Sequence, residues 1–466
     1  MSHDVTASNT YTRGMAEFIA GLRYENIPRE VRERIKLLIL DSLGCGLYAA
    51  DLEWSRILMN TLSAVDTTTQ CGAWGTACRL SAPHAALVNG TLVQGFEIDD
   101  VHHRGPIHLG AVTLPALIAV AELHPGMSGR TFLTAAVAGY EVGPRVLLCM
   151  GPEHIGQGWH SGATGGVFAG AAAAASALGL DTEKSVHALG IAGTQSAGLM
   201  AAQYGAMVKR MHAGRAAQSG LYGALLAQNG FTGIVDVFES PYGGFCTTFS
   251  RSQDNFNLDE LTSGLGERYE TMDIRLKFYS CVGGVHTTLD AIRALREQQP
   301  FTAAEVEKVV VYVSQISKDH SGWDYRPEGV TSAQLNMTYC VATMLLDGEV
   351  FVDQFSEKMV ADPARLALLK KVDVRHDPEI TARGRAYRHM VHVEVHLKNG
   401  RVLKKTMEKK LGSDTFPDAG RVIRKFETLA RHALPQPQVQ QLLDAVMKLD
   451  ELADTSALAR LLTKPH

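Results

Sequence analysis

GATGGVFAGAAAAASALG, residues 162–179, is the stretch of sequence that most clearly decides how this chain folds. It predicts a buried helix, although a glycine inside a helix costs up to about 1 kcal/mol relative to alanine. Two explanations can offset that cost: a close approach of neighbouring helices, or a ligand held near the backbone. We favour close packing for most of these glycines, and we therefore predict a core of tightly packed helices.

Apolar residues at helical spacing extend this prediction along the first half of the chain. PREVRERIKLLILDSLGCGLYAA (28–50) begins with proline and places its apolar residues on one helical face. The same spacing predicts further helices at about 82–96, 112–124, 129–149, 163–179 and 206–229. We therefore expect the first half to be almost entirely α, without a series of strands.

The pattern changes beyond about residue 270. A helix is predicted to begin near Thr302 and to lead into VEKVVVYVSQ (306–315), whose β-branched run predicts a strand. HMVHVEVHLKNGRVLKKTME (389–408) alternates apolar and polar residues around Asn399-Gly400, which predicts a hairpin with a type I′ turn. Helical spacing then returns near the C-terminus, including a predicted helix over 438–452.

Composition and charge argue against several classes of protein. The 466 residues are 45% hydrophobic and carry a formal net charge of −4 without a long block of like charges, so nucleic acid is not an expected partner. The longest small-apolar run, Val167–Leu180, is shorter than the roughly 20 residues of a membrane span. MSHDVTASNTYTRGMAEF (1–18) resembles no signal peptide, and the seven cysteines form no C-x-x-C pair. We expect a cytoplasmic protein with reduced thiols.

The densest polar cluster is EIDDVHHRGPIH (97–108), which follows one predicted helix and precedes another. Its adjacent carboxylates, Asp99 and Asp100, and its imidazoles could supply a general acid and base, because histidine titrates near neutral pH and an aspartate can fix its tautomer. The same groups could instead bind Zn, Mn or Fe. They could also be solvated charges at a helix C-terminus. For six such residues together we favour a functional site.

Two further segments place polar groups beside predicted helices. GWHSGATG (158–165) precedes the alanine-rich helix, whose N-terminus could hold a carboxylate while His160 adds charge or a proton; one of its hydroxyl groups could equally be a simple cap. MVKRMHAGRAA (207–217) places Lys209 and His212 on one helical face among small residues. Cations on such a face indicate an anionic ligand or a buried partner.

KFYSCVGGVH (277–286) is the fourth candidate segment, with Lys277 and several reactive side chains around a Gly-Gly bend. Cys281 has no visible partner base, so we interpret it as structural. Arg210 and Arg215, in the third segment, can be ordinary surface charges. The chain contains no G-x-S-x-G, H-E-x-x-H or G-x-x-x-x-G-K-[ST] motif, and its glycine-rich stretch follows no strand, which disfavours nucleotide and hydride chemistry.

These segments, in this order, resemble the MmgE/PrpD family, which includes 2-methylcitrate dehydratases, cis-aconitate decarboxylases and iminodisuccinate epimerases. The resemblance covers almost the entire chain. It rests on EIDDVHHRGPIHLGAVTLPA (97–116), GWHSGATGGVFAGAAAAA (158–175), KRMHAGRAAQSGLYGALLAQNGFTG (209–233), KFYSCVGGVHTTLDAI (277–292), LNMTYCVATMLLDGEV (335–350) and RVIRKFETLA (421–430).

The resemblance implies a mainly α fold, with an all-helical large domain and a smaller inserted α+β lid domain, usually assembled as a homodimer. We expect residues 1–268 to form the first part of the helical domain and residues 269–405 to form the lid. Residues 406–466 are expected to return to the helical domain.

The resemblance also implies a site between the two domains, with neither metal nor cofactor, because lysines already supply positive charge. We hypothesise that His108, oriented by Asp100, transfers a proton, and that Tyr339 is a second acid. Carboxylates of a small polycarboxylate substrate are assigned to Lys209 and Lys277. The remaining expected substrate contacts are His160, His212, Asp99 and His103.

All three family reactions stabilise negative charge on a carboxylate while a proton leaves or joins the adjacent carbon. We expect a lyase, most simply a dehydratase of a 2-methylcitrate-like hydroxy acid. The alternatives are an epimerase of an iminodisuccinate-like acid, a cis-aconitate-type decarboxylase, and a non-catalytic binding protein on the same fold. Valine at 101 and 282, where the decarboxylase branch has threonine and a second histidine, weighs against decarboxylation, as does a longer loop between Asp100 and His108.

Overall fold

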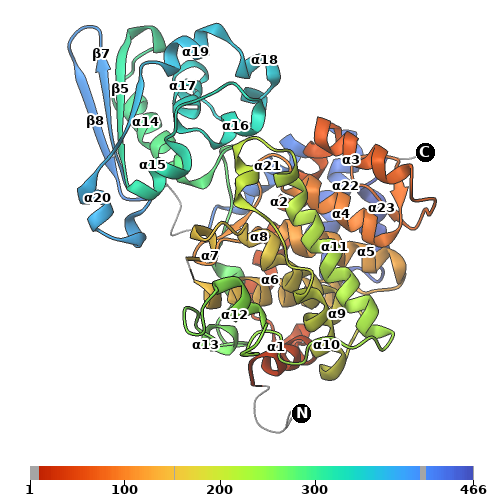
Figure 1. Cartoon of the computed structure of the whole chain (residues 1–466). Coiled ribbons are helices and arrows are strands. Elements are labelled where there is room, and N and C mark those ends of the chain that lie inside the picture. Colours follow the sequence, from red (N-terminus) through yellow and green to blue (C-terminus); the bar gives the residue numbers. More distant parts are fainter. Residues whose placement is uncertain (1–9, 152, 410–415, 465–466) are drawn as a thin grey trace.

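The computed structural model describes residues 10–151, 153–409 and 416–464, so the first half of the N-terminal stretch discussed above lies outside it. Its apolar side chains form two buried clusters. The side chains of one cluster come from residues within 15–276 and 422–462, and those of the other come mostly from residues within 279–403. We call residues 10–276 and 416–464 the helical body, and residues 277–409 the sheet lobe. Figure 1 shows the lobe at the upper left, next to the helices of the body.

The helical body is built almost entirely from helices, as the apolar spacing predicts. Its strands are two-residue pairs: β1 (Cys71–Gly72) with β2 (Arg79–Leu80), and β3 (Val101–His102) with β4 (Ile274–Arg275). The helices are α1 (Thr10–Gly21), α2 (Arg29–Tyr48), α3 (Glu53–Ser63), α4 (Ala82–Val93), α5 (Leu109–Leu123), α6 (Gly129–Met150), α7 (Glu153–Gly156), α8 (Ser161–Thr164), α9 (Gly166–Ala177), α10 (Thr182–Gly193), α11 (Val208–Gln228), α12 (Phe245–Ser250), α13 (Asp259–Thr262), α21 (Ala419–Ala430), α22 (Gln436–Met447) and α23 (Ser456–Leu461).

Close helix packing explains the glycines of the alanine-rich stretch. α9 packs against α5, α6 and α11. A Cβ on Gly166 would lie 2.6 Å from the side chain of Val112, and one on Gly220 of α11 would lie 2.5 Å from the backbone nitrogen of Ala171. The predicted continuous helix over 163–179 is interrupted at Gly165, so the short α8 precedes α9.

The C-terminal segment returns to the body, where α21 packs along α2. α21 presents Val422, Phe426 and Leu429 as fully buried side chains, in agreement with their helical spacing. α22 ends at Met447, and a 3₁₀ turn, not the predicted α-helix, continues over Leu449–Glu451.

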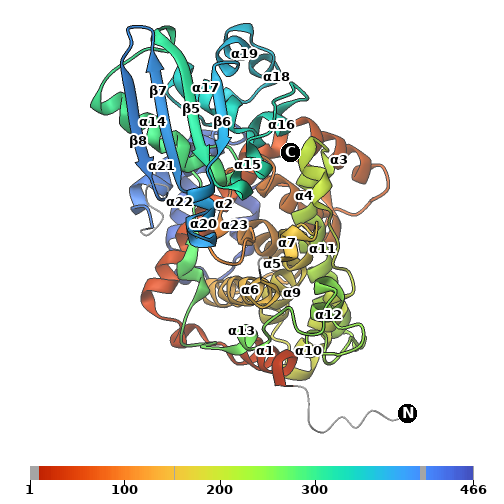
Figure 2. The same ribbon diagram turned by 60° about the vertical axis from the view of Figure 1, so that its left-hand side comes forward.

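The sheet lobe carries one four-stranded sheet in the order β6-β5-β7-β8, formed by β6 (Val372–His376), β5 (Val306–Val313), β7 (Val391–Leu397) and β8 (Val402–Met407). β5 is parallel to β6, and the other two pairs are antiparallel. α14 covers one face of this sheet (Figure 2). The lobe helices are α14 (His286–Gln298), α15 (Gln315–Ser321), α16 (Val330–Leu335), α17 (Met337–Asp347), α18 (Glu357–Val360), α19 (Pro363–Leu369) and α20 (Pro378–Ala382).

Two local predictions for the lobe were wrong. The segment after Thr302 forms a single 3₁₀ turn, because Thr302 and Glu305 close a capping box and β5 begins at the next residue. The hairpin loop is not type I′, which needs a positive φ at both central residues. Among the described residues, Gly400 has a positive φ of 84° and Asn399 does not, and the loop has three residues between Leu397 and Arg401.

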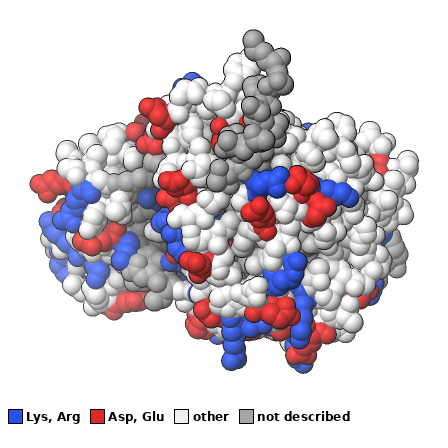
Figure 3. All heavy atoms as spheres, turned by 90° about the horizontal axis from the view of Figure 1, so that it is seen from below, with Lys and Arg blue, Asp and Glu red and all other residues white. Residues whose placement is uncertain are grey.

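Length and apolar composition single out α6 as one helix that could cross a membrane, although 94% of its most apolar window is buried inside the protein. The face seen in Figure 3 carries acidic and basic side chains next to one another.

The crossing of α9 and α11 generates a stability prediction. Gly220→Ala would push a Cβ against the backbone of α9, so we expect the free energy of unfolding to fall by about 1–3 kcal/mol. Gly21→Ala, at the end of α1, is the matched control because its Cβ would meet no atom within 4 Å; its effect should stay within about 0.5 kcal/mol. Urea unfolding measures both, and equal stability of the two variants would contradict close packing as the role of Gly220.

Candidate active site

A cavity of about 460 Å³ lies where the helical body meets the sheet lobe. The three side chains expected to hold carboxylates, His160, Lys209 and Lys277, all line it, as do His103 and His108. The fold therefore brings these five residues, which come from four separate segments of the chain, to one cavity.

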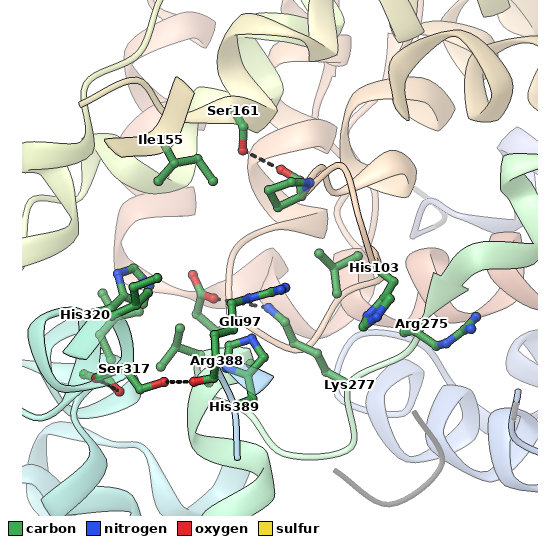
Figure 4. Close-up of a pocket in the computed structure, with 18 of the residues that line it drawn as sticks. Glu97, His103, Ile155, Ser161, Arg275, Lys277, Ser317, His320, Arg388 and His389 are labelled. Atoms are coloured by element: carbon green, nitrogen blue, oxygen red, sulfur yellow. Dashed lines mark hydrogen bonds and ion pairs between the residues drawn. The ribbon is translucent and has the colours of Figure 1, made fainter. Parts of the chain in front are cut away.

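Both parts of the protein contribute to the cavity wall. Figure 4 shows Ile155 and Ser161 of the body on one side and Ser317 and His320 of the lobe on the other. The lobe residues were not predicted, because no polar cluster or motif marks them in the sequence. Apolar side chains complete the wall, including Val101, Met200, Val282, Ile316 and Leu335.

The carboxylate of Glu97 is at the centre of the charged groups. Arg210 donates to its Oε1 at 2.8 Å, Lys277 donates to its Oε2 at 3.3 Å, and Lys209 also contacts Oε1. Burial raises the pKa of Glu97, but the three cations outweigh that effect and hold the pKa well below its usual range. Glu97 is therefore a buried anion that keeps three cations together.

The two lysines are close enough to hold one small acid, because a single carboxylate bridges them. Lys277 also lies 3.7 Å from Asp99 Oδ1. The pKa of Lys277 is raised because Glu97 and Asp99 outweigh its burial, whereas burial lowers the pKa of Lys209. Each ammonium group has three N–H donors, so each can bind a substrate oxygen in addition to Glu97.

Arg210 is fully buried, contrary to the expectation of a surface charge. Its Nη2 donates to Thr331 Oγ1 at 3.0 Å and to Gln334 Oε1 at 2.8 Å, both in α16 of the lobe. Arg210 thus joins Glu97 of the body to the lobe. Neither its burial nor its partners could be deduced from helical spacing.

His108 occupies the N-cap position of α5, with its Nδ1 2.9 Å from Asp99 Oδ2. The contact is poorly aligned for a hydrogen bond, since both atoms are buried without an aligned partner. Catalytic hydrogen bonds are often loose in ligand-free proteins. Burial raises the pKa of Asp99, but His108 and Lys277 lower it below its usual value, so Asp99 is the carboxylate that contacts His108.

Asp100 does not orient His108, and the sequence-based assignment is corrected here. Successive residues point in different directions, so its carboxylate turns away and accepts from the backbone N–H of Gly110 at 3.1 Å. Burial, and then the charge of Asp99, raise the pKa of Asp100 well above its usual range. Asp100 therefore has a structural contact and does not line the cavity.

His160 and His212 form a buried pair with 3.2 Å between their Nδ1 atoms. Burial and Lys209 lower the pKa of His160 well below its usual range, and the same causes lower the pKa of His212 to about 4. His160 thus offers the cavity a neutral imidazole, not the charge expected from sequence. His212 lies behind it, outside the cavity lining.

The expected anion site at a helix N-terminus is also corrected. α8 has only four residues and is separated from α9 by Gly165. Ser161 Oγ donates to the Pro106 carbonyl, and Thr164 Oγ1 is 2.6 Å from His154 Nε2. The Ser161 hydroxyl thus links α8 to the loop at Pro106, and the Thr164 hydroxyl links α8 to α7.

Tyr339 is not in the cavity lining, so its proposed role as a second acid is wrong. Its hydroxyl donates to the Gln354 carbonyl at 3.1 Å, and burial raises its pKa. Its ring packs inside the lobe beside Phe355 and Tyr325. Cys281 is fully buried and its pKa is raised by burial, as expected of a structural thiol.

His102, which was considered as a metal ligand, has a structural role. In the described part of the chain, His102, Glu270 and Asp273 can bring ligand atoms within 4.8 Å of one another. However, His102 Nε2 lies 3.0 Å from Glu270 Oε2, its Nδ1 accepts from Gly105, and Arg104 also donates to Glu270. These contacts use the groups that a cation would need.

Two family models together match most of the chain. Residues 13–257 match the MmgE/PrpD N-terminal domain, and residues 279–451 match the MmgE/PrpD C-terminal domain. The chain belongs to the MmgE/PrpD family. Relatives that match it along almost their full length are named as cis-aconitate decarboxylases or as similar to them.

Three of these relatives illustrate the similarity. The cis-aconitate decarboxylase-like protein oryM of Aspergillus oryzae is 34% identical over 99% of this chain and 98% of its own length. The cis-aconitate decarboxylase of Aspergillus terreus is 34% identical over 100% of this chain and 98% of its own. The cis-aconitate decarboxylase of Mus musculus is 29% identical over 97% of this chain and 93% of its own.

The His160–His212 pair generates a pH prediction. His212 has a pKa of about 4 in the folded protein and one near 6.5 when unfolded, so the unfolded chain binds this proton at a higher pH. The free energy of unfolding should therefore fall as the pH drops below about 6.5, and this group alone should remove about 2 kcal/mol between pH 7 and pH 5.

Urea unfolding at both pH values tests this expectation, with His212→Asn as the comparison. The variant lacks the titrating group, so its loss of stability on acidification should be smaller by about 2 kcal/mol. An equal loss in the two proteins would show that His212 does not resist protonation.

Proposed function

We propose that this protein is a cofactor-independent decarboxylase of cis-aconitate or a close tricarboxylic analogue. Its similarity to cis-aconitate decarboxylases along the full chain carries the proposal. This replaces the initial preference for dehydration, which the relatives named above do not support. The cationic cavity beside an imidazole–carboxylate pair is chemically suited to the reaction.

Binding relies on the positive charge held by Glu97. A tricarboxylate brings more negative charge than neutral side chains can stabilise, and Lys209 and Lys277 offer charge-assisted hydrogen bonds to it. Neutral His160 adds a hydrogen-bonding group without repelling the lysines. We propose that the sheet lobe acts as a lid that excludes water, because its residues Ser317 and His320 form the opposite wall.

The reaction needs one bond broken and one proton delivered. The bond between the saturated carbon and its carboxylate breaks, and carbon dioxide leaves. The electron pair forms a new double bond to the central carbon, while the old double bond accepts a proton at its far carbon, giving 2-methylenesuccinate. We assign that proton to His108, since Asp99 contacts Nδ1 and leaves Nε2 for transfer.

The two valines that distinguish this chain from the decarboxylase branch both face the cavity. Val101 and Val282 are lining residues, so the site lacks a hydroxyl group and an imidazole at these places. The lobe supplies other imidazoles to the same cavity, from His320 and His389. The proposed reaction needs only one proton donor, so these substitutions are compatible with it.

Product analysis tests the proposed function. Incubation with cis-aconitate in deuterated water should release carbon dioxide and give 2-methylenesuccinate with one deuterium at the newly protonated carbon. Treatment with a chelator should leave the rate unchanged, because the charge stabilisation is assigned to lysines. Parallel incubations contain 2-methylcitrate and iminodisuccinate. Dehydration or epimerisation of these acids, without carbon dioxide release from cis-aconitate, would overturn the proposal.

Neighbouring aspartates provide a matched pair of variants. Asp99→Asn removes the carboxylate that orients His108 and should lower kcat by about 10²- to 10⁴-fold, comparable to His108→Ala. Asp100→Asn keeps an oxygen that can accept from the Gly110 N–H outside the cavity lining, and should retain most of the activity. Steady-state kinetics on cis-aconitate decide the matter, and an equal or larger loss in Asp100→Asn would return the orienting role to Asp100.

A further inference from the structure

The C-terminal segment reaches the candidate active site through one buried side chain. Lys425 of α21 donates from Nζ to the carbonyl oxygen of Ile98 at 2.6 Å. Its second contact is the carboxylate of Asp41 in α2, with Nζ 2.7 Å from Oδ1. Both side chains are at least 95% buried, and neither lines the cavity. The reaction described above uses neither of them.

The carbonyl that Lys425 holds lies between two residues of the site. Ile98 separates Glu97, which gathers the cations, from Asp99, which orients His108. Glu97 has a φ of 57°, a left-handed backbone conformation that is unfavourable for a residue with a side chain. Such a conformation persists only where the surrounding structure holds it.

The backbone on the other side of Glu97 is also held. The Phe96 carbonyl accepts from Ser280 Oγ at 2.7 Å and from Gln334 Nε2 at 2.9 Å. Two groups of the lobe therefore hold the backbone before Glu97, and Lys425 of the body holds the backbone after it. Loss of either support leaves the Glu97 turn free to relax toward a common backbone conformation.

We propose that Lys425, with Asp41 as its counter-ion, is a positioning residue of the active site that fixes the Glu97 turn through the Ile98 carbonyl. The role of Asp41 is to keep the ammonium group of Lys425 charged and directed at the Ile98 carbonyl, because a buried ammonium group needs an anionic partner. α21 also contacts the residue that follows Lys277, because the guanidinium of Arg421 lies 3.8 Å from the ring centre of Phe278. One C-terminal helix thus contacts two of the segments that supply charged groups to the cavity, at Ile98 and at Phe278.

The experiment compares three variants of the full chain. Lys425→Met keeps the length of the side chain and removes the donor. Arg424→Met removes an exposed cation from the same helix and is the control. Asp41→Asn with Lys425→Met removes both buried charges, so no carboxylate is left unpaired, while the donor to Ile98 is still missing. Measurements are kcat and KM on cis-aconitate, the unfolding midpoint, and amide hydrogen exchange over residues 96–100.

Lys425→Met should lower kcat by about a hundredfold, since a small displacement of catalytic groups has an effect of that size, and should speed exchange over 96–100. The double variant should recover stability but stay slow, with fast exchange, whereas Arg424→Met should match the wild type. Recovery of kcat in the double variant would overturn the proposal, because it would show that only the unpaired Asp41 mattered.

The rate measurement depends on the proposed function, but the exchange measurement does not. If the wild type fails to turn over cis-aconitate, the proposed function fails, and protection of residues 96–100 still decides the role of Lys425. Unchanged exchange and unchanged kcat in Lys425→Met would overturn the positioning role even if cis-aconitate is the substrate.

Discussion

The buried carboxylate of Glu97 is the constraint on which the site depends. Three cations cannot share a desolvated cavity unless an anion among them offsets their repulsion and their lost hydration. Glu97 meets this requirement between Lys209, Arg210 and Lys277. The surrounding structure provides the position of that carboxylate: a left-handed turn after α4, the small-residue crossings of α11, and the segment that leads into the lobe.

Much of the fold follows from local patterns, and the exceptions have identifiable causes. The long helices were predictable because their apolar periodicity coincides with the faces that they bury. The glycines of this stretch predicted close packing, and the structure places Gly166 against the side chain of Val112 and Gly220 against the backbone of α9. The break at Gly165, the capping box at Thr302 and the three-residue hairpin loop depend on one or two residues each, so spacing over a longer window does not detect them.

The members of the site could be predicted better than their pairings. The polar cluster at 97–108 and the two lysines converge as expected, because each stood out against apolar surroundings. However, the sequence does not distinguish Asp99 from Asp100 as the partner of His108. The course of the backbone decides that the carboxylate of Asp99 contacts His108. Tyr339 lies in one of the segments that resemble the family (335–350), yet its side chain packs in the interior of the lobe. Val101 and Val282 argue against decarboxylation by sequence. They are only two positions, however, and similarity along the whole chain to cis-aconitate decarboxylases is the broader observation.

Arg210 links the two parts of the protein through a single guanidinium group, which bonds Glu97 in the body and Thr331 and Gln334 in the lobe. Any hinge movement that separates the parts must break those lobe contacts or pull on the turn that carries Glu97. In such a movement, opening of the cavity and arrangement of its charges would be mechanically coupled. The guanidinium group that offsets the charge of Glu97 would also resist separation of the two parts, so the electrostatics of the site and its accessibility would change together.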